Sequence, residues 1–304
     1  MDKKYVGSGI VLLLLTVLLV AGGRYQYRKL SSDRAANETL STATEEPKKE
    51  EISETASAPE DPSEEVLYRA VPADVVTAEG LRVNHPENAE AGKIIYLTFD
   101  DGPCMYTAKL LGILDKYNVK ATFFVTDMTP EYEYMIYEEK SSGHSVGVHS
   151  YSHVYDKIYE SEDAFWADFN LMNNVIYKYT GEKTDIIRFP GGSSNEISKF
   201  NPGIMTRLVA ETGDRGLYYF DWNVICGDAD GAKTSAEIYN NIVNGIAEKI
   251  PTLEDGEEIV ILCHDNHEIT VNAMEDVINW GLDQGYTFLP LTKDSYPKHH
   301  TIHN

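Results

Sequence analysis

The sequence predicts an α/β protein built on a parallel β-sheet, and two patterns in its last two-thirds indicate this fold class. Short apolar runs with the character of buried strands alternate with segments whose apolar residues recur at helical spacing. Such repeated alternation implies a parallel sheet, open or closed into a barrel. Polar residues follow the predicted strands, where sheets of this kind collect functional groups. The predicted strands are 93–99, 120–125, 145–149, 185–189, 217–225, 258–264 and 287–291.

Three segments between these strands predict amphipathic helices, because each carries an apolar stripe with a period close to 3.6 residues. The second of them begins with Thr234 and Glu237, a pair with the spacing of a capping box. The stripes are Phe165, Phe169, Met172, Ile176 and Tyr179; Ile238, Ile242, Ile246 and Ile250; and Val271, Met274, Ile278 and Leu282.

The N-terminal region predicts a targeting segment and a spacer. Residues 1–23 hold an uncharged stretch, Val6 to Gly23, flanked by basic residues, which is typical of a membrane anchor or a cleavable signal peptide. We expect an uncleaved single-pass anchor in the cell membrane and an extracellular catalytic domain; cleavage would give a secreted protein. Residues 24–65 are polar and acidic and predict a disordered linker. Residues 66–92 are expected to lead into one catalytic domain, 93–304.

Composition narrows the classes of partner. The formal net charge of −23 argues against nucleic acid, whose phosphates would repel the chain. No protein partner can be inferred.

The three cysteines, Cys104, Cys226 and Cys263, fit no zinc-ribbon spacing and are expected to be small buried hydrophobes. The histidines near the C-terminus, His299, His300 and His303, are expected to lie in solvent.

Residues with the chemistry of a hydrolytic metal site lie in or directly after five of the predicted strands, towards their carboxyl ends. Each has a structural alternative: an aspartate can cap a helix, and a histidine pair can be solvated. Their joint occurrence at one edge of a sheet favours a metal site with an acid and a base. Strand alternation puts Leu262 and His264 on one face and Cys263 on the other. The residues are Asp100 and Asp101; His149 and His153; Arg188 and Gly191; Asp221 and Trp222; and Leu262 and His264.

These residues resemble, in order, the five motifs of the polysaccharide deacetylases, the carbohydrate esterase family 4 enzymes with the NodB homology domain. The motifs read Thr-Phe-Asp-Asp-Gly from Thr98, His-Ser-x-x-His from His149, Arg-x-Pro-x-Gly from Arg188, Asp-Trp from Asp221 and Ile-Leu-x-His-Asp from Ile261. The resemblance covers about 93–291 and implies a distorted (β/α) barrel. It also implies a divalent metal ion, most often Zn²⁺ with Co²⁺ as an alternative.

The resemblance further implies roles for individual residues. Asp101, His149 and His153 would bind the metal, and a metal-bound water would be the nucleophile. Asp100 would be the general base, paired with Arg188. His264 would be the general acid, paired with Asp221. Trp222 and Leu262 would line the acetyl pocket, and the Gly191 N–H would hold the oxyanion. The family often carries Tyr where Gly191 stands, so a ring that could touch a sugar is missing here.

The function that these expectations favour is removal of N-acetyl groups from a cell-wall polysaccharide, above all peptidoglycan amino sugars. An O-acetyl esterase acting on xylan or a similar polysaccharide is the alternative among enzymes. A catalytically inactive sugar-binding surface protein is the alternative outside them. The expected partners are thus an N-acetylated glycan, such as peptidoglycan or a chitin-like polymer, and the membrane.

Overall fold

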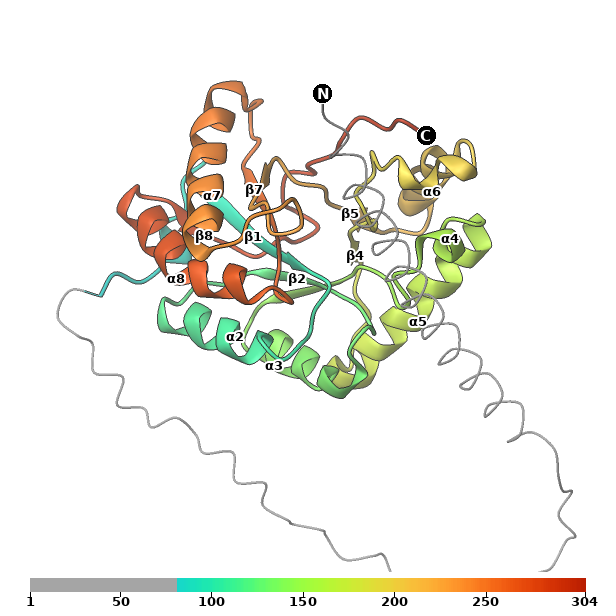
Figure 1. Cartoon of the computed structure of the whole chain (residues 1–304), viewed down its shortest axis with the longest axis horizontal. Coiled ribbons are helices and arrows are strands. Elements are labelled where there is room, and N and C mark those ends of the chain that lie inside the picture. Colours follow the sequence, from blue (N-terminus) through green and yellow to red (C-terminus); the bar gives the residue numbers. More distant parts are fainter. Residues whose placement is uncertain (1–80) are drawn as a thin grey trace, which may run out of the picture. The chain divides into compact units, whose positions relative to one another are not determined.

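The computed structural model (Figure 1) describes residues 81–304, whose strands form one curled parallel sheet, a half-barrel. Its strand order is β5-β4-β3-β2-β1-β7-β6, and β8 pairs with the start of β1. Every pairing is parallel, as the strand–helix alternation predicts. The strands are β1 (Ile94–Asp100), β2 (Thr122–Val125), β3 (Ser145–Val148), β4 (Ile186–Ile187), β5 (Tyr218–Tyr219), β6 (Val224–Ile225), β7 (Ile259–His264) and β8 (Thr287–Phe288).

The prediction of one strand over 217–225 is wrong, and the sheet is open at this place. The segment splits into β5 and β6, which lie at opposite ends of the strand order. The chain leaves the edge of β4 after Phe220, whose N–H donates to the Ile187 carbonyl, and reaches the edge of β7 at Asn223. Because the two halves pair with different strands, Asp221 and Trp222 lie in the connection between them.

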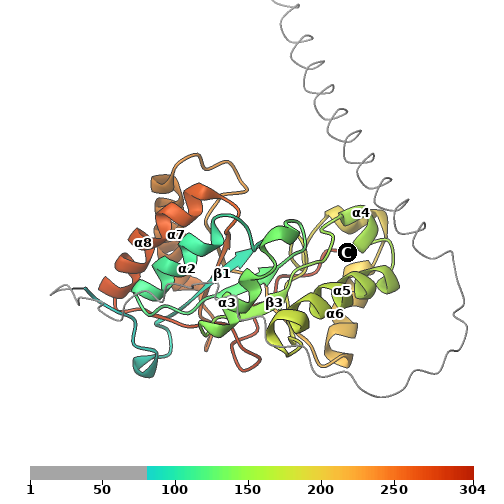
Figure 2. The same ribbon diagram turned by 90° about the horizontal axis from the view of Figure 1, so that it is seen from below.

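Helices cover the outer face of the sheet in the same order as the strands beneath them. Each helix contacts the next one in the series α7, α8, α2, α3, α5, α6 (Figures 1 and 2). The helices are α2 (Thr107–Lys116), α3 (Met135–Ser141), α4 (Tyr155–Ile158), α5 (Glu162–Thr180), α6 (Ile204–Asp214), α7 (Ser235–Lys249) and α8 (Glu268–Asp283). Short 3₁₀ turns are η1 (Pro86–Asn88), η2 (Pro130–Tyr132), η3 (Ile197–Phe200) and η4 (Ile250–Thr252).

The three predicted stripes lie on α5, α7 and α8, and most of their residues are buried in the main core. The exposed exception is Ile250, which lies beyond α7 in η4. The capping box at the start of α7 is confirmed. Thr234 accepts a hydrogen bond from the Glu237 N–H, and the Glu237 carboxylate accepts one from the Thr234 N–H. Helix α7 therefore begins where its sequence indicates.

Side chains of β1 and β7 alternate between the helix-covered face and the concave face of the sheet. Odd-numbered apolar residues, such as Phe99 and Cys263, belong to the main core under the helices. Tyr96 and Val260 belong to a second, smaller cluster. The prediction that Cys263 and His264 point in opposite directions is confirmed, because Cys263 is fully buried and His264 is partly exposed. All three cysteines are buried, as expected, and they are unbridged in the structure.

The prediction that the C-terminal histidines lie in solvent is wrong for His300, which is partly buried; His299 and His303 are exposed, although His299 also packs on the domain. The His299 ring stacks on Tyr219 with centroids 3.7 Å apart. The His300 N–H donates to Asp221 Oδ2 at 2.7 Å, and its Nε2 lies 2.7 Å from the Trp222 carbonyl oxygen. The segment therefore bridges the opening between β5 and β6, where unpaired backbone groups offer it partners.

The predicted anchor (1–23), the linker (24–65) and most of the lead-in (66–92) lie outside the described residues. Over 81–304, the structure contains no helix with the length and apolar character of a membrane span. The described end of the lead-in packs on the domain through Asn84. Its amide donates to the Phe288 carbonyl and accepts from the Phe288 N–H, each at 2.8 Å.

Candidate metal and catalytic site

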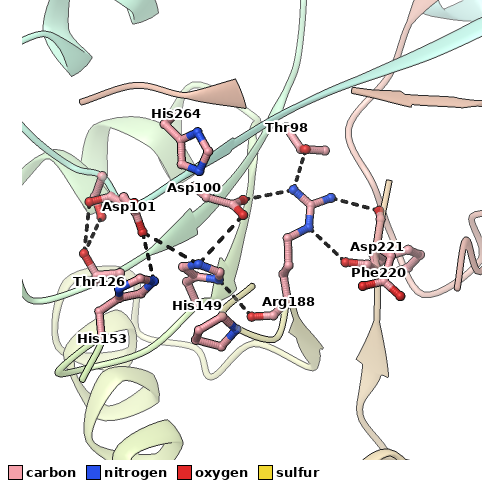
Figure 3. A network of polar contacts seen from close by, with 12 residues as sticks. Thr98, Asp100, Asp101, Thr126, His149, His153, Arg188, Phe220, Asp221 and His264 are labelled. Carbon is pink, nitrogen blue, oxygen red and sulfur yellow. Dashed lines mark hydrogen bonds and ion pairs between the residues drawn. The ribbon is translucent and has the colours of Figure 1, made fainter. Parts of the chain in front are cut away.

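Asp101, His149 and His153 converge at the carboxyl ends of β1 and β3 (Figure 3). One ligand atom from each lies within 4.8 Å of the others. Asp101 Oδ1 is 3.6 Å from His149 Nε2 and 3.4 Å from His153 Nε2. This oxygen is buried and accepts no hydrogen bond from the part of the chain that the structure describes. A buried carboxylate oxygen facing two imidazole nitrogens fits a divalent cation, which would satisfy all three atoms.

The protonation state of His149 also suits a metal ligand. Its Nδ1 lies 2.9 Å from the Arg188 carbonyl oxygen, which can only accept, so Nδ1 carries the proton. Its Nε2 lone pair is then directed at Asp101 Oδ1. Burial lowers the pKa of His149 to about 3, which keeps the ring neutral. A backbone hydrogen bond of this kind sets the orientation of many metal-binding histidines.

Two of the three candidate ligands have left-handed backbone conformations, with φ of 74° at Asp101 and 50° at His153. Such conformations are unfavourable for residues other than glycine and persist only where surrounding contacts hold them. At Asp101 these contacts come from Thr126, whose hydroxyl donates to the Asp101 carbonyl at 3.0 Å. At His153 they come from the loop described next.

The loop from His149 to His153 is held by Asp168, a residue of α5 that the sequence analysis missed. One carboxylate oxygen accepts from the Ser150 hydroxyl at 2.6 Å and the Tyr151 N–H at 2.7 Å, and the other accepts from the Ser152 N–H at 2.9 Å. Ser150 Oγ in turn accepts from the His153 N–H at 2.8 Å. Asp168 thus fixes the backbone between the two histidines.

Replacing Asp168 by Ala is expected to weaken metal binding about 10- to 100-fold, the usual effect of removing a group that orients metal ligands. Three donors in the loop would lose their acceptor, and the two imidazoles would lose their fixed separation. A chelator competition titration measures the affinity. Asp163→Ala, in the first turn of the same helix, is the matched control. Wild-type affinity in a folded Asp168→Ala protein would contradict this role.

Asp100 lies beside the candidate metal site and is paired with Arg188, as expected (Figure 3). The Arg188 guanidinium donates to Asp100 Oδ1 at 2.9 Å, and the other carboxylate oxygen lies 3.8 Å from His149 Nε2. Burial raises the pKa of Asp100, and the positive charge of Arg188 opposes this rise. A carboxylate with a raised pKa is a stronger base than one in water.

Arg188 is fully buried, and its donors are directed at four oxygens on the concave side of the sheet. In addition to its hydrogen bond to Asp100, Arg188 donates to the Thr98 hydroxyl at 2.6 Å and to the carbonyls of Phe220 and Asp221 at 2.9 and 3.1 Å. Its guanidinium carbon lies 4.3 Å from the centroid of the Phe124 ring. Both its position and its charge are therefore fixed.

His264 is the register partner of Asp100 on the neighbouring strand β7, so the two side chains share one face. The carboxylate that pairs with it is Asp228, and the predicted pairing with Asp221 is wrong. His264 Nδ1 lies 2.8 Å from Asp228 Oδ1, and the His264 N–H donates to Asp228 Oδ2 at 2.8 Å. Thr270 Oγ1 also donates to Asp228 Oδ2 at 2.8 Å. Asp228 follows β6, so the strand-end rule would have identified it had the break in 217–225 been recognised.

The electrostatics of the two residues match this pairing. Burial lowers the pKa of His264, but the hydrogen bond and charge of Asp228, with the charges of Asp100 and Asp101, raise it to about 9. Burial raises the pKa of Asp228, but its bonds to His264 and other donors lower it to about 2. His264 therefore carries a proton at neutral pH while Asp228 is ionised.

Asp221 instead organises the wall of the site. It is fully buried and accepts from the Ser193 N–H at 2.8 Å and from the Ser193 hydroxyl. It thereby holds the loop that contains Gly191. Trp222 lies over this loop, because a Cβ at Gly192 would be 2.8 Å from its ring. Leu262 lies on β7, half-exposed and two residues before His264.

A parallel half-barrel whose strand ends carry an Asp-His-His cluster, an Arg-held carboxylate and a carboxylate-held histidine defines a hydrolase-like site of the NodB (β/α) class. The family model for polysaccharide deacetylases matches residues 87–200. The chain belongs to the polysaccharide deacetylase family.

Relatives and solved structures agree with this assignment. The chain is 28% identical over 304 residues to a peptidoglycan-N-acetylglucosamine deacetylase of Bacillus cereus, covering 97% of this chain and 96% of that protein. It is 30% identical over 208 residues to the putative polysaccharide deacetylase YheN of Bacillus subtilis, covering 68% and 70%. The crystal structure of the catalytic domain of peptidoglycan N-acetylglucosamine deacetylase from Eubacterium rectale matches with 49% identity and a TM-score of 0.67, covering 74% and 99%.

Proposed function

We propose that the protein removes acetyl groups from N-acetylated amino sugars of a cell-wall polysaccharide, with peptidoglycan as the substrate, in a reaction that depends on a divalent cation. The observation that carries the proposal is the buried Asp101 Oδ1, which accepts no hydrogen bond within residues 81–304 and faces two imidazole nitrogens, one of them beside Asp100. The substrate class is supported by relatives named as deacetylases of peptidoglycan N-acetylglucosamine and N-acetylmuramic acid.

Asp101, His149 and His153 are the residues that would hold the cation. A carboxylate with two imidazoles suits Zn²⁺, with Co²⁺ as the alternative, and three protein ligands are typical of a catalytic rather than a structural zinc. When bound, the cation supplies a Lewis acid that polarises an acetyl oxygen and increases the acidity of a water.

Asp100 and His264 divide the proton transfers between them. Asp100 takes a proton from the attacking water, because it is acceptor-only when ionised and Arg188 fixes its orientation. His264 gives a proton to the departing amine. Asp228 makes this proton available, because it keeps the His264 ring protonated. The Gly191 N–H holds the developing oxyanion, and Trp222 with Leu262 lines the acetyl pocket.

The location that suits this substrate is the outer face of the cell membrane. The uncharged N-terminal stretch would anchor the chain, and the acidic linker would let the catalytic domain reach the wall. Both remain predictions from the sequence. Comparing the mass of the protein in membrane and culture fractions tests anchoring against cleavage.

Removing the metal is expected to abolish acetate release from N-acetylated peptidoglycan, and adding Zn²⁺ or Co²⁺ is expected to restore it. The measurement is enzymatic assay of acetate after dialysis against a chelator and re-addition of each metal. Asp101→Ala is the matched variant, since it removes one ligand and leaves both histidines. Full activity in metal-stripped Asp101→Ala protein would overturn the proposal.

Substrate comparison separates the alternatives. Acetate release from acetylxylan with none from peptidoglycan or chitooligosaccharide would indicate the O-acetyl esterase. Binding without turnover at saturating Zn²⁺ would indicate the sugar-binding protein. Mass spectrometry of defined muropeptides then shows whether N-acetylglucosamine or N-acetylmuramic acid loses the acetyl group.

A further inference from the structure

The ring of Tyr155 occupies the space beside Gly191, where the sequence analysis expected no aromatic side chain. Gly191 has φ of 77°, and a Cβ built on it would lie 3.6 Å from Tyr155 Cε1 and 3.2 Å from the Asn195 Cβ. The edge of the Tyr155 ring is therefore in van der Waals range of the Gly191 position. A tyrosine from α4 thus supplies an aromatic group next to the backbone amide that is proposed to hold the oxyanion.

Tyr155 also contacts the candidate metal site on its other side. Its ring meets the His153 ring nearly edge to face, with centroids 5.1 Å apart and planes at 69°. The phenol hydroxyl is bonded to the carbon next to Cε1, so the ring that carries this donor contacts both a candidate metal ligand and the Gly191 position. The side chain is partly exposed, so a substrate has access to it.

The position of the ring is fixed by Tyr159, one turn further along. The two rings stack with centroids 6.3 Å apart, and the buried Tyr159 hydroxyl donates to the Pro190 carbonyl at 2.8 Å. Helix α4 is therefore fastened to the loop that carries Gly191. A donor held in this way loses little freedom when it meets a substrate, which is the condition for effective stabilisation of a transition state.

We propose that the Tyr155 hydroxyl is a catalytic group that donates a hydrogen bond to the substrate's acetyl oxygen, beside the Gly191 N–H. This inference rests on the proposed deacetylation. A phenol keeps its proton throughout the neutral range, so it is a donor under working conditions. Because the acetyl oxygen gains negative charge only as the water adds, the bond strengthens in the transition state.

The test is Tyr155→Phe, which removes the hydroxyl and keeps the ring that packs on His153 and Tyr159. We expect kcat to fall about 100-fold with KM nearly unchanged, the behaviour of a lost oxyanion donor. Zn²⁺ content and melting temperature should equal those of the wild type. Acetate, the product, should bind the Zn²⁺-loaded variant at least about 10-fold more weakly in isothermal titration, because its carboxylate would also accept this bond. Tyr177→Phe, an exposed tyrosine of α5, is the matched control.

Each outcome has one meaning. A fall in kcat and in acetate affinity with full metal content supports the proposal. An unchanged kcat, a change in KM alone, or activity lost together with the metal overturns it. A wild-type protein that releases no acetate from any N-acetylated glycan overturns the proposed function instead, so the two failures are distinguishable.

Discussion

Replacing Asp100 by Asn is expected to lower kcat about 10²- to 10⁴-fold, the contribution of a well-placed general base. The amide has nearly the same shape and still offers Arg188 an acceptor, but it cannot take a proton from water. The measurement is kcat for acetate release as a function of pH. In the wild type, activity should fall as the pH drops through the pKa of Asp100, which burial has raised above its usual value.

The same substitution is expected to destabilise the fold, because Arg188 is fully buried and loses its charged partner. Breaking a buried ion pair typically costs about 3–5 kcal/mol. Activity must therefore be measured well below the melting temperature of the variant. Glu139→Gln is the matched control. Glu139 is fully buried on α3, outside the candidate site, and burial raises the pKa of its carboxyl, so the same exchange of a buried carboxyl for an amide is made away from the chemistry. An Asp100→Asn protein with the kcat of the wild type would show that another residue is the base.

Much of the site was predictable because it depends on local rules. The two-residue period of a strand puts Asp100 and His264 on the faces where they occur, and parallel pairing of β1 with β7 then brings them into register. The strand-end rule brought Asp101 together with His149 and His153. The strand order itself, which puts β2 between β1 and β3 and pairs β1 with β7, came from the structure.

The residues that sequence reasoning missed depend on contacts that no local pattern encodes. Asp168 reaches the histidine loop from a helix, and nothing in its spacing distinguishes it from a solvated acidic residue. Tyr155 meets Gly191 only because α4 folds back on that loop. The partners of His300 are 78 and 79 residues earlier in the chain, so its packing against Trp222 and Asp221 could not be read from a polar C-terminal sequence.

The pairing of Asp221 with His264 failed for a related reason. The family resemblance implied this pairing, and Asp221 lies in one continuous run, 217–225, that predicts a single strand. The run in fact changes its pairing partner from β4 to β7 within a few residues, and this break turns Asp221 towards Ser193 and the C-terminal segment. Asp228, beyond the break, takes the place beside His264. Where a sheet opens is decided by long-range pairing, and the local sequence did not reveal it.

Replacing Asp228 by Asn is expected to move the alkaline limit of activity to lower pH. His264 must be protonated to release the amine, so activity falls as the pH rises through its pKa, which is about 9 with Asp228 in place. The amide oxygen can still accept from His264 Nδ1, but the negative charge is lost; since a hydrogen bond to a charged group contributes about 1.5–3 kcal/mol in total, the shift is at most about 1–2 pH units. The measurement is the pH profile of kcat.

Asp221→Asn discriminates between the two candidate partners of His264, because it should lower stability and leave the alkaline limit of activity in place.

The pH dependence of stability gives a second test of the pairing between His264 and Asp228. Because the folded-state pKa of His264 is raised, its stabilising contribution is complete below about pH 6.5 and is lost as the pH rises through about 9. The contribution of Asp228, whose pKa is lowered to about 2, is present above its ordinary value and is lost as the pH falls through 2. The difference in melting temperature between the wild type and Asp228→Asn should therefore be largest from the ordinary pKa of an aspartate up to about pH 6.5, and it should shrink above pH 9. An alkaline limit that moves in Asp221→Asn and stays in Asp228→Asn would restore the pairing that the sequence suggested.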